Sequence, residues 1–302
     1  KTDPNDVWLL YLPLHHIGGL SPLFRSIISG TTTATMDFPS SENLRLCMQK
    51  YDITCLSLVP TLLTRFLKEQ IDLSALRLLL LGGGPIPENL LSQCKSLSIP
   101  IHPTYGSTET SSQIATATSS DLLKHPRTVG RSLSSLNLVI QNEKNQLVDE
   151  GEYGEIIVSG PMVSKGYFPF DTCQSKKLSN HTFRTGDMGY LRDGFLWILG
   201  RMDDLIITGG EKVYPLEIEN VLLTHPTVSD AAVFSEPDDE WGSKIIAIVV
   251  KNNSTVSEKE ILLFCQKKLS DHKIPKTIHS VDSIPRTVTG TFNSRSFSSN
   301  NK

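Results

Sequence analysis

Residues 76–91 read LRLLLLGGGPIPENLL, an apolar run that stops at three glycines. The run at 76–81 is typical of a buried strand, and a helix is expected from about Glu88. Glycines between a strand and a helix let the backbone approach a bound molecule closely. The stretch therefore predicts a strand–loop–helix unit whose loop, at residues 82–85, holds a ligand.

The first part of the chain repeats this alternation. Residues 53–59 form a short apolar strand, Pro60 suits the first turn of a helix, and another strand is expected around residues 99–102. Such alternation predicts an α/β layer with a largely parallel sheet. Ligands of such sheets bind beyond the carboxyl ends of the strands, where residues 82–84 and 105–108 both fall.

The sequence changes character twice further along. Short strands dominate from about residue 126, and Asp193-Gly194 is a strong signal for a hairpin turn. A compact α+β pattern follows Asp203. We therefore expect an α/β fold in three parts, at residues 1–125, 126–202 and 203–302.

Composition excludes several classes of protein. The 302 residues carry a formal net charge of -3, which gives no electrostatic footprint for nucleic acid or an anionic membrane. No apolar segment approaches the roughly 20 residues of a membrane span. The five cysteines show no metal-ligand spacing and are expected to be reduced thiols of a cytoplasmic protein.

Residues 104–110, TYGSTET, gather side chains that suit a nucleotide. Tyr105 can stack on a purine, the hydroxyls can bind phosphate, and Glu109 can hold Mg²⁺ through oxygen. The alternative is a plain hydrophilic loop with a helix N-cap at Thr108.

Two further clusters are polar and rich in glycine. Asp187, in FRTGDMG, could accept both hydroxyls of a ribose, or could simply form a turn. Residues 199–211, LGRMDDLIITGGE, could be an exposed linker ending in a turn, or could let a thin substrate approach Gly209 and Gly210.

The order and spacing of these clusters resemble the acyl-adenylate-forming (AMP-binding) superfamily, in its acyl-CoA synthetase branch. The resemblance runs from LPLHHIGG, residues 12–19, to Arg295. Within that branch, residues 104–116 look most like the o-succinylbenzoate–CoA ligases of menaquinone and phylloquinone synthesis. The three parts would then be the second half of a large AMP-binding core, its β-rich subdomain and a small mobile C-terminal domain.

The resemblance implies a role for each motif residue. Thr108 would bind the α-phosphate, Glu109 the Mg²⁺ that accompanies ATP, and His16 would border the acyl pocket. Asp203 would be the hinge between two half-reactions. The nucleotide-binding set would be Gly82, Gly83, Gly84, Pro85, Tyr105, Gly106, Asp187 and Arg201, and the loop that lines the coenzyme A tunnel would be Gly209 and Gly210.

The implied reaction has two steps. A carboxylic acid attacks the α-phosphorus of MgATP to give an acyl-adenylate, and the thiol of coenzyme A then displaces AMP. The expected partners are these small molecules, with no nucleic acid. The oligomeric state is left open, a homo-oligomer being one alternative.

The chain departs from the family pattern in two places. The Ser/Thr/Gly-rich phosphate loop that should lie upstream of His15-His16 is absent, so an N-terminally truncated piece is expected. Thr291 stands where the family usually has lysine, and Lys273 and Lys276 match other, surface positions. Adenylation by this chain is therefore expected to be impaired.

Three alternatives to the o-succinylbenzoate ligase remain. One is a nucleotide- or CoA-binding remnant without turnover, and another is a CoA ligase for a different aromatic or fatty acid. The third is a luciferase-like mono-oxygenase, which would use the same adenylate.

Overall fold

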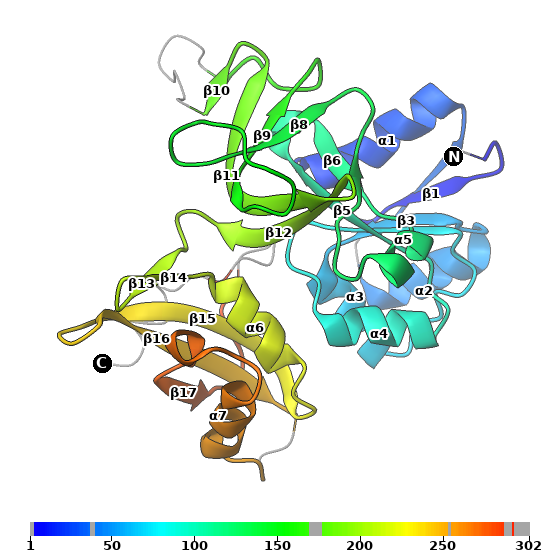
Figure 1. The fold of residues 1–302 in the computed structure, drawn as a ribbon. Coiled ribbons are helices and arrows are strands. Elements are labelled where there is room, and N and C mark those ends of the chain that lie inside the picture. Colours follow the sequence, from blue (N-terminus) through cyan, green and yellow to red (C-terminus); the bar gives the residue numbers. More distant parts are fainter. Residues whose placement is uncertain (1–2, 37–39, 169–176, 253–254, 287–291, 293–302) are drawn as a thin grey trace. The chain divides into compact units, whose positions relative to one another are not determined.

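The computed structural model describes residues 3–36, 40–168, 177–252, 255–286 and 292 (Figure 1). The chain divides into two compact units. The N-terminal unit holds residues 1–86, 90–185 and 189–198, and the C-terminal unit holds residues 87–89, 186–188 and 199–302. Thr291 and its neighbour Gly290 lie outside the described residues.

The N-terminal unit is built on a seven-stranded sheet in the order β2-β1-β3-β4-β5-β6-β7. Strands β2 to β5 pair in parallel, whereas β5–β6 and β6–β7 are antiparallel. The strands are β1 (Val7–Leu10), β2 (Thr32–Thr35), β3 (Cys55–Leu58), β4 (Leu78–Leu81), β5 (Ile101–Ser107), β6 (Ser112–Thr116) and β7 (Arg131–Ser132).

Helices cover both faces of the parallel strands (Figure 1). They are α1 (Ile17–Ser29), α2 (Ser41–Lys50), α3 (Pro60–Lys68), α4 (Glu88–Ser96) and the short α5 (Ser119–Lys124). Alternate residues of each strand face opposite sides, as pleating requires. On one side Leu9, Leu56 and Leu79 share a core with helices α2 to α4, and on the other Trp8 packs with Cys55. The α/β class and the parallel sheet predicted from the sequence are confirmed.

A second, five-stranded sheet completes this unit, in the order β10-β11-β9-β8 with β12 beside β11. Its strands are β8 (Asn137–Gln141), β9 (Gly154–Ser159), β10 (Leu178–Ser179), β11 (Thr182–Arg192) and β12 (Phe195–Arg201). Asp193 and Gly194 both have positive φ, 51° and 74°, and turn the chain between β11 and β12. The predicted hairpin turn is confirmed.

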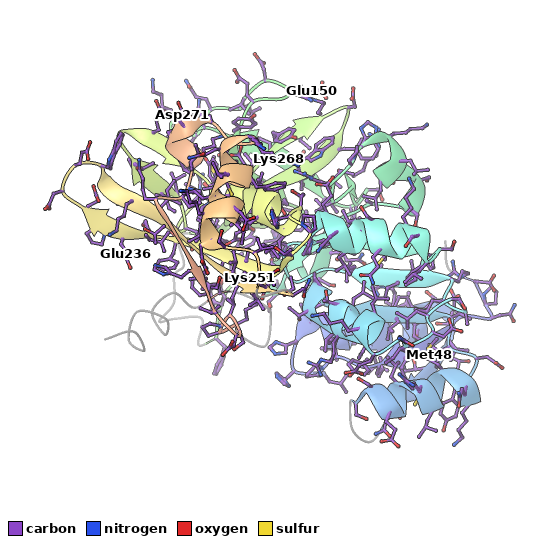
Figure 2. All side chains as sticks on the ribbon, turned by 90° about the horizontal axis from the view of Figure 1, so that it is seen from below. Met48, Glu150, Glu236, Lys251, Lys268 and Asp271 are labelled. Carbon is purple, nitrogen blue, oxygen red and sulfur yellow. The ribbon has the colours of Figure 1, made fainter. Side chains whose placement is uncertain are left out.

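The C-terminal unit is a small α+β fold. Strands β15 and β16 form a long antiparallel hairpin, and β17 pairs with β16 in parallel. Glu236 and Lys251 lie towards opposite ends of this hairpin (Figure 2). The elements are β13 (Ile206–Thr208), β14 (Glu211–Val213), α6 (Pro215–Leu223), β15 (Val228–Asp238), β16 (Gly242–Lys251), α7 (Glu258–Gln266), the 3₁₀ turn η2 (Asp271–Lys273) and β17 (Thr277–Ser280).

The sheet of this unit is apolar on both faces. Helices α6 and α7 pack on one face, where Ile218 and Ile261 are fully buried. On the other face, Phe292 packs against a cluster that includes Phe234 and Ile284. The boundaries drawn from the sequence at residues 125/126 and 202/203 stay predictions.

A buried carboxylate ties the amino ends of three parallel strands together. Asp6, 2% exposed, precedes β1 and forms an ion pair with Arg77, which precedes β4. The Thr54 hydroxyl, ahead of β3, donates to Asp6 at 3.2 Å and accepts the Val7 amide at 2.9 Å. Burial alone would raise the pKa of Asp6, but hydrogen bonds from Arg77 and the Asp3 amide outweigh it and lower that pKa to about 2.

Asp6→Asn should therefore destabilise the chain in a pH-dependent way. A depressed carboxyl pKa stabilises the fold above the ordinary value of 3.8 and ceases to do so as the pH falls towards 2. We expect a loss of about 2 kcal/mol at pH 7 that shrinks between pH 4 and pH 2, measured by urea unfolding. Asp149→Asn, at an exposed position, removes the same charge and serves as the control. An equal loss of unfolding free energy for Asp6→Asn at both ends of the pH range would contradict the lowered pKa of Asp6.

Candidate functional site

The glycine loop leaves the carboxyl end of β4 and lies beside the end of β3 and the middle of β5. The Gly82 amide donates to the Leu58 carbonyl at 3.2 Å. A Cβ on Gly82 would lie 2.5 Å from Thr104 Oγ1 and 2.8 Å from its carbonyl oxygen, so no larger residue fits there. Gly83 has φ +80°, which favours glycine, and both Gly83 and Pro85 are exposed. The loop therefore offers open backbone at the edge of the sheet where the fold predicts a ligand.

Strand β5 is longer than the sequence predicted and includes the first four residues of the TYGSTET motif. It extends to Ser107, so Tyr105 and Gly106 lie on a strand and not in a loop. A Cβ on Gly106 would come within 1.8 Å of the Ser112 carbonyl oxygen, which explains the glycine. Tyr105 is half-buried against the core of the second sheet.

A 3₁₀ turn, η1 (Thr108–Thr110), follows β5, and its three polar residues differ in solvent exposure. Its N-cap is Ser107, so the alternative of an N-cap at Thr108 is wrong. Thr110 is fully buried and its hydroxyl accepts the Ser107 amide at 3.2 Å. Thr108, by contrast, is exposed and Glu109 is half-buried, so both of these polar residues are accessible after the end of β5.

Two residues after this turn have unusual backbone angles. Ser111 has φ 56° and Ser112 has φ 108°, values that are costly for residues with a Cβ. They allow the chain to reverse between β5 and β6, with Ser107 paired to Ser112. Local strain of this kind is common at functional sites, which fits the position of Thr108 and Glu109.

Glu109 is held by a distant segment. Tyr167 donates its hydroxyl hydrogen to Glu109 Oε1. The Ser164 amide donates to the Glu109 carbonyl oxygen at 2.7 Å. Sequence reasoning missed Tyr167, because nothing in a local pattern connects positions that are 58 residues apart.

His16 stands at the start of α1. It is the N-cap residue, with extended φ and ψ of -100° and 141°, and its ring centroid lies 4.2 Å from that of His15. Its carbonyl oxygen accepts the amides of Gly19 and Leu20 at 3.0 Å. The side chain is half-buried, so the imidazole is accessible at a helix N-terminus.

The C-terminal unit places Asp187 and Arg201 side by side. Asp187 lies within β11, so the alternative of a turn-forming aspartate is wrong. The Met202 amide donates to the Gly186 carbonyl at 2.8 Å, and Arg201 Nη1 lies 2.9 Å from Asp187 Oδ1. Asp203 is 3.9 Å from the same guanidinium and is 79% exposed. The Arg201 guanidinium thus fixes the direction of the Asp187 carboxylate.

Gly209 and Gly210 form the tip of the β13–β14 hairpin. Their φ angles are +57° and +84°, as a two-residue hairpin turn requires. The Gly209 amide donates to the Trp241 carbonyl at 2.9 Å, and a Cβ on Gly209 would lie 2.9 Å from the Trp241 ring. Nothing lies within 4 Å of a Cβ on Gly210, so this tip is open backbone on one side and packed on the other.

The family of the chain follows from two matching models. The model of the AMP-binding enzymes matches residues 1–168, and that of the AMP-binding enzyme C-terminal domain matches residues 217–291. The chain belongs to the AMP-binding enzyme family. Its membership in the superfamily predicted from the motifs is therefore confirmed.

Relatives within the AMP-binding enzymes are close in sequence and structure. A 2-succinylbenzoate–CoA ligase of Bacillus licheniformis is 41% identical over 94% of this chain and 59% of its own length. An o-succinylbenzoate CoA synthetase of Bacillus subtilis, solved with its OSB-AMP acyl-adenylate intermediate, superposes with a TM-score of 0.86 at 37% identity, over 97% of this chain and 60% of that one. The same enzyme with ATP and magnesium also gives 0.86, at 37% identity over 96% and 61%. The chain thus spans about 60% of the length of these relatives.

None of the described helices combines the length and the apolar composition that crossing a bilayer demands. Among the described residues, no group of three or more histidine, cysteine, aspartate or glutamate side chains is arranged to hold a metal ion.

Gly19→Ala should damage the N-terminus of α1, whereas Gly18→Ala should not. A Cβ on Gly19 would lie 2.3 Å from the Pro13 carbonyl oxygen, while one on Gly18 would meet Leu12 at an ordinary 3.7 Å. We expect Gly19→Ala to cost about 1–3 kcal/mol of unfolding free energy through overpacking. Gly18→Ala should gain up to about 1 kcal/mol through helix propensity. Thermal unfolding of both variants checks this, and equal stabilities would refute the close approach at Gly19.

Proposed function

We propose that the chain belongs to an ATP-dependent acid–CoA ligase that acts on o-succinylbenzoate. The observation that carries the proposal is that β4 and β5 pair in parallel, so the open glycine loop and the turn with Thr108 and Glu109 follow the carboxyl ends of adjacent strands. The 41% identity to a 2-succinylbenzoate–CoA ligase supports the substrate. The enzyme would take part in menaquinone synthesis in the cytoplasm.

The N-terminal unit would bind the adenine and α-phosphate of ATP. The exposed backbone at Gly83 and Pro85 suits contact with a flat base, and part of the Tyr105 ring is accessible for stacking. The exposed hydroxyl of Thr108 can donate to a phosphate oxygen. These groups act by positioning the nucleotide and by stabilising charge that develops on the α-phosphate.

Glu109 fits the magnesium that such a reaction needs. Mg²⁺ is usually held by one or two carboxylates together with phosphates and water, so a single accessible carboxylate is sufficient. The ion would neutralise charge on the phosphates as pyrophosphate leaves. Glu109 would hold the ion through one carboxylate oxygen, with phosphate oxygens and water as the other ligands.

The C-terminal unit would bind the ribose and coenzyme A. Asp187, held in direction by Arg201, can accept hydrogen bonds from two vicinal hydroxyls. The open backbone at Gly210 suits a thin pantetheine arm. Asp203, an exposed residue beside Arg201, would serve as the hinge between adenylation and thioester formation.

His16 would face the acid. A half-buried imidazole at a helix N-terminus can hydrogen-bond a carboxylate, which o-succinylbenzoate carries. The alternative function is nucleotide or coenzyme A binding without turnover. It is favoured by Thr291 at the position where the family usually has lysine.

The two half-reactions distinguish a ligase from a protein that binds nucleotide or coenzyme A without turnover. We expect the chain to form a CoA thioester from ready-made o-succinylbenzoyl-adenylate and coenzyme A, and to release little pyrophosphate from ATP and the free acid. Mass spectrometry of the thioester and a pyrophosphate assay measure the two steps. Joining the chain to the N-terminal two fifths of the Bacillus licheniformis ligase should restore pyrophosphate release. If the isolated chain binds AMP but forms no thioester, the binding function is correct and the ligase is not.

Thr291→Lys should accelerate adenylation in the joined protein. A fixed charge at a developing anion is commonly worth about 10²–10³ in rate. We expect a gain of that order in pyrophosphate release and little change in thioester formation from the adenylate. Thr289→Lys adds the same charge two residues away and serves as the matched control. An unchanged adenylation rate in Thr291→Lys would show that the charge is not required.

A further inference from the structure

The segment that follows β9 lies along the 3₁₀ turn that carries Glu109. The Ser164 amide donates to the Glu109 carbonyl at 2.7 Å, and the Ser111 hydroxyl donates to the Met162 carbonyl at 3.0 Å. Val163, between these two contacts, is 4% exposed within the core of the second sheet. The segment is therefore fixed on both sides of the turn.

A local turn brings Tyr167 back to Glu109. The Ser164 hydroxyl donates to the Gly166 carbonyl at 3.1 Å and accepts the Gly166 amide at 3.4 Å. The next residue is Tyr167, 39% exposed, whose hydroxyl donates to Glu109 Oε1. Among the described residues, Glu109 Oε2 has no hydrogen-bond donor. One carboxylate oxygen is thus engaged and the other remains available.

The phenol is a permanent donor at neutral pH. Burial, and then the hydrogen bond and charge of Glu109, raise the pKa of Tyr167 to about 12. A hydrogen bond from a hydroxyl to a carboxylate is stronger than a hydrogen bond between two neutral groups. The direction of the Glu109 carboxylate is therefore set by Tyr167 as well as by its own backbone.

We propose that Tyr167 is a positioning residue for the metal-binding carboxylate, presenting Glu109 Oε2 to the cation that accompanies ATP. The inference rests on the proposed function, in which Glu109 is a ligand of that cation. Hydrogen-bonding partners of a metal ligand usually change metal affinity about 10–100-fold when removed. Tyr167 acts through its hydrogen bond to Glu109.

The test compares the affinity for MgATP with that for AMP in the absence of magnesium. Tyr167→Phe, which keeps the ring, should weaken MgATP binding about 10–100-fold relative to AMP binding, measured by calorimetry. A merely structural role would weaken both nucleotides alike. Tyr153→Phe, at a tyrosine that is 62% exposed, is the control and should change neither.

A double-mutant cycle shows whether Tyr167 acts through Glu109. Tyr167→Phe should have no further effect on MgATP affinity in a Glu109→Gln background. Equal effects in both backgrounds, or an effect of less than twofold in the native background, would overturn the proposal. If Glu109→Gln itself leaves MgATP affinity unchanged, the metal site of the proposed function is wrong as well.

Discussion

Parallel strand pairing is the constraint on which the candidate site depends. Because β3, β4 and β5 run in one direction, the loops that leave their carboxyl ends must meet at one edge of the sheet. The same pairing gathers their amino ends at the opposite edge, where Asp6 is buried with Arg77. The buried ion pair that stabilises the fold and the open, polar loops of the candidate site thus lie at opposite ends of the parallel strands. A substitution at one edge can leave the other intact.

The sequence predicted those parts of the fold that are encoded by local patterns. The leucine run 78–81, Pro60 at the start of α3 and the Asp193-Gly194 turn were each confirmed. Strand lengths were predicted less well. The residues at 104–107 look like a polar loop but continue β5, because β6 returns antiparallel beside them and supplies hydrogen-bond partners. Pairing with a later strand overrides local propensity here.

Local sequence patterns predict even less of the candidate site than of the fold. Glu109 and Asp187 can be found by residue type and motif, but their exact surroundings cannot. Asp187 was open to interpretation as a turn residue until Arg201, on the next strand, was seen to fix its carboxylate. Tyr167 had no signal at all, since its role comes from a contact across 58 residues. Residue types identify the chemistry, and only the fold identifies the groups that orient it.

The packing of Gly209 against Trp241 has an optical consequence. The chain holds three tryptophans, of which Trp8 and Trp197 belong to the N-terminal unit and Trp241 to the C-terminal unit. Indole emission responds to its immediate surroundings, and those of Trp241 are the tip of the β13–β14 hairpin and the ammonium group of Lys276, 4.3 Å from the ring centroid. The C-terminal unit therefore carries its own fluorophore at the hairpin, and emission from Trp241 can report on that loop without an attached dye.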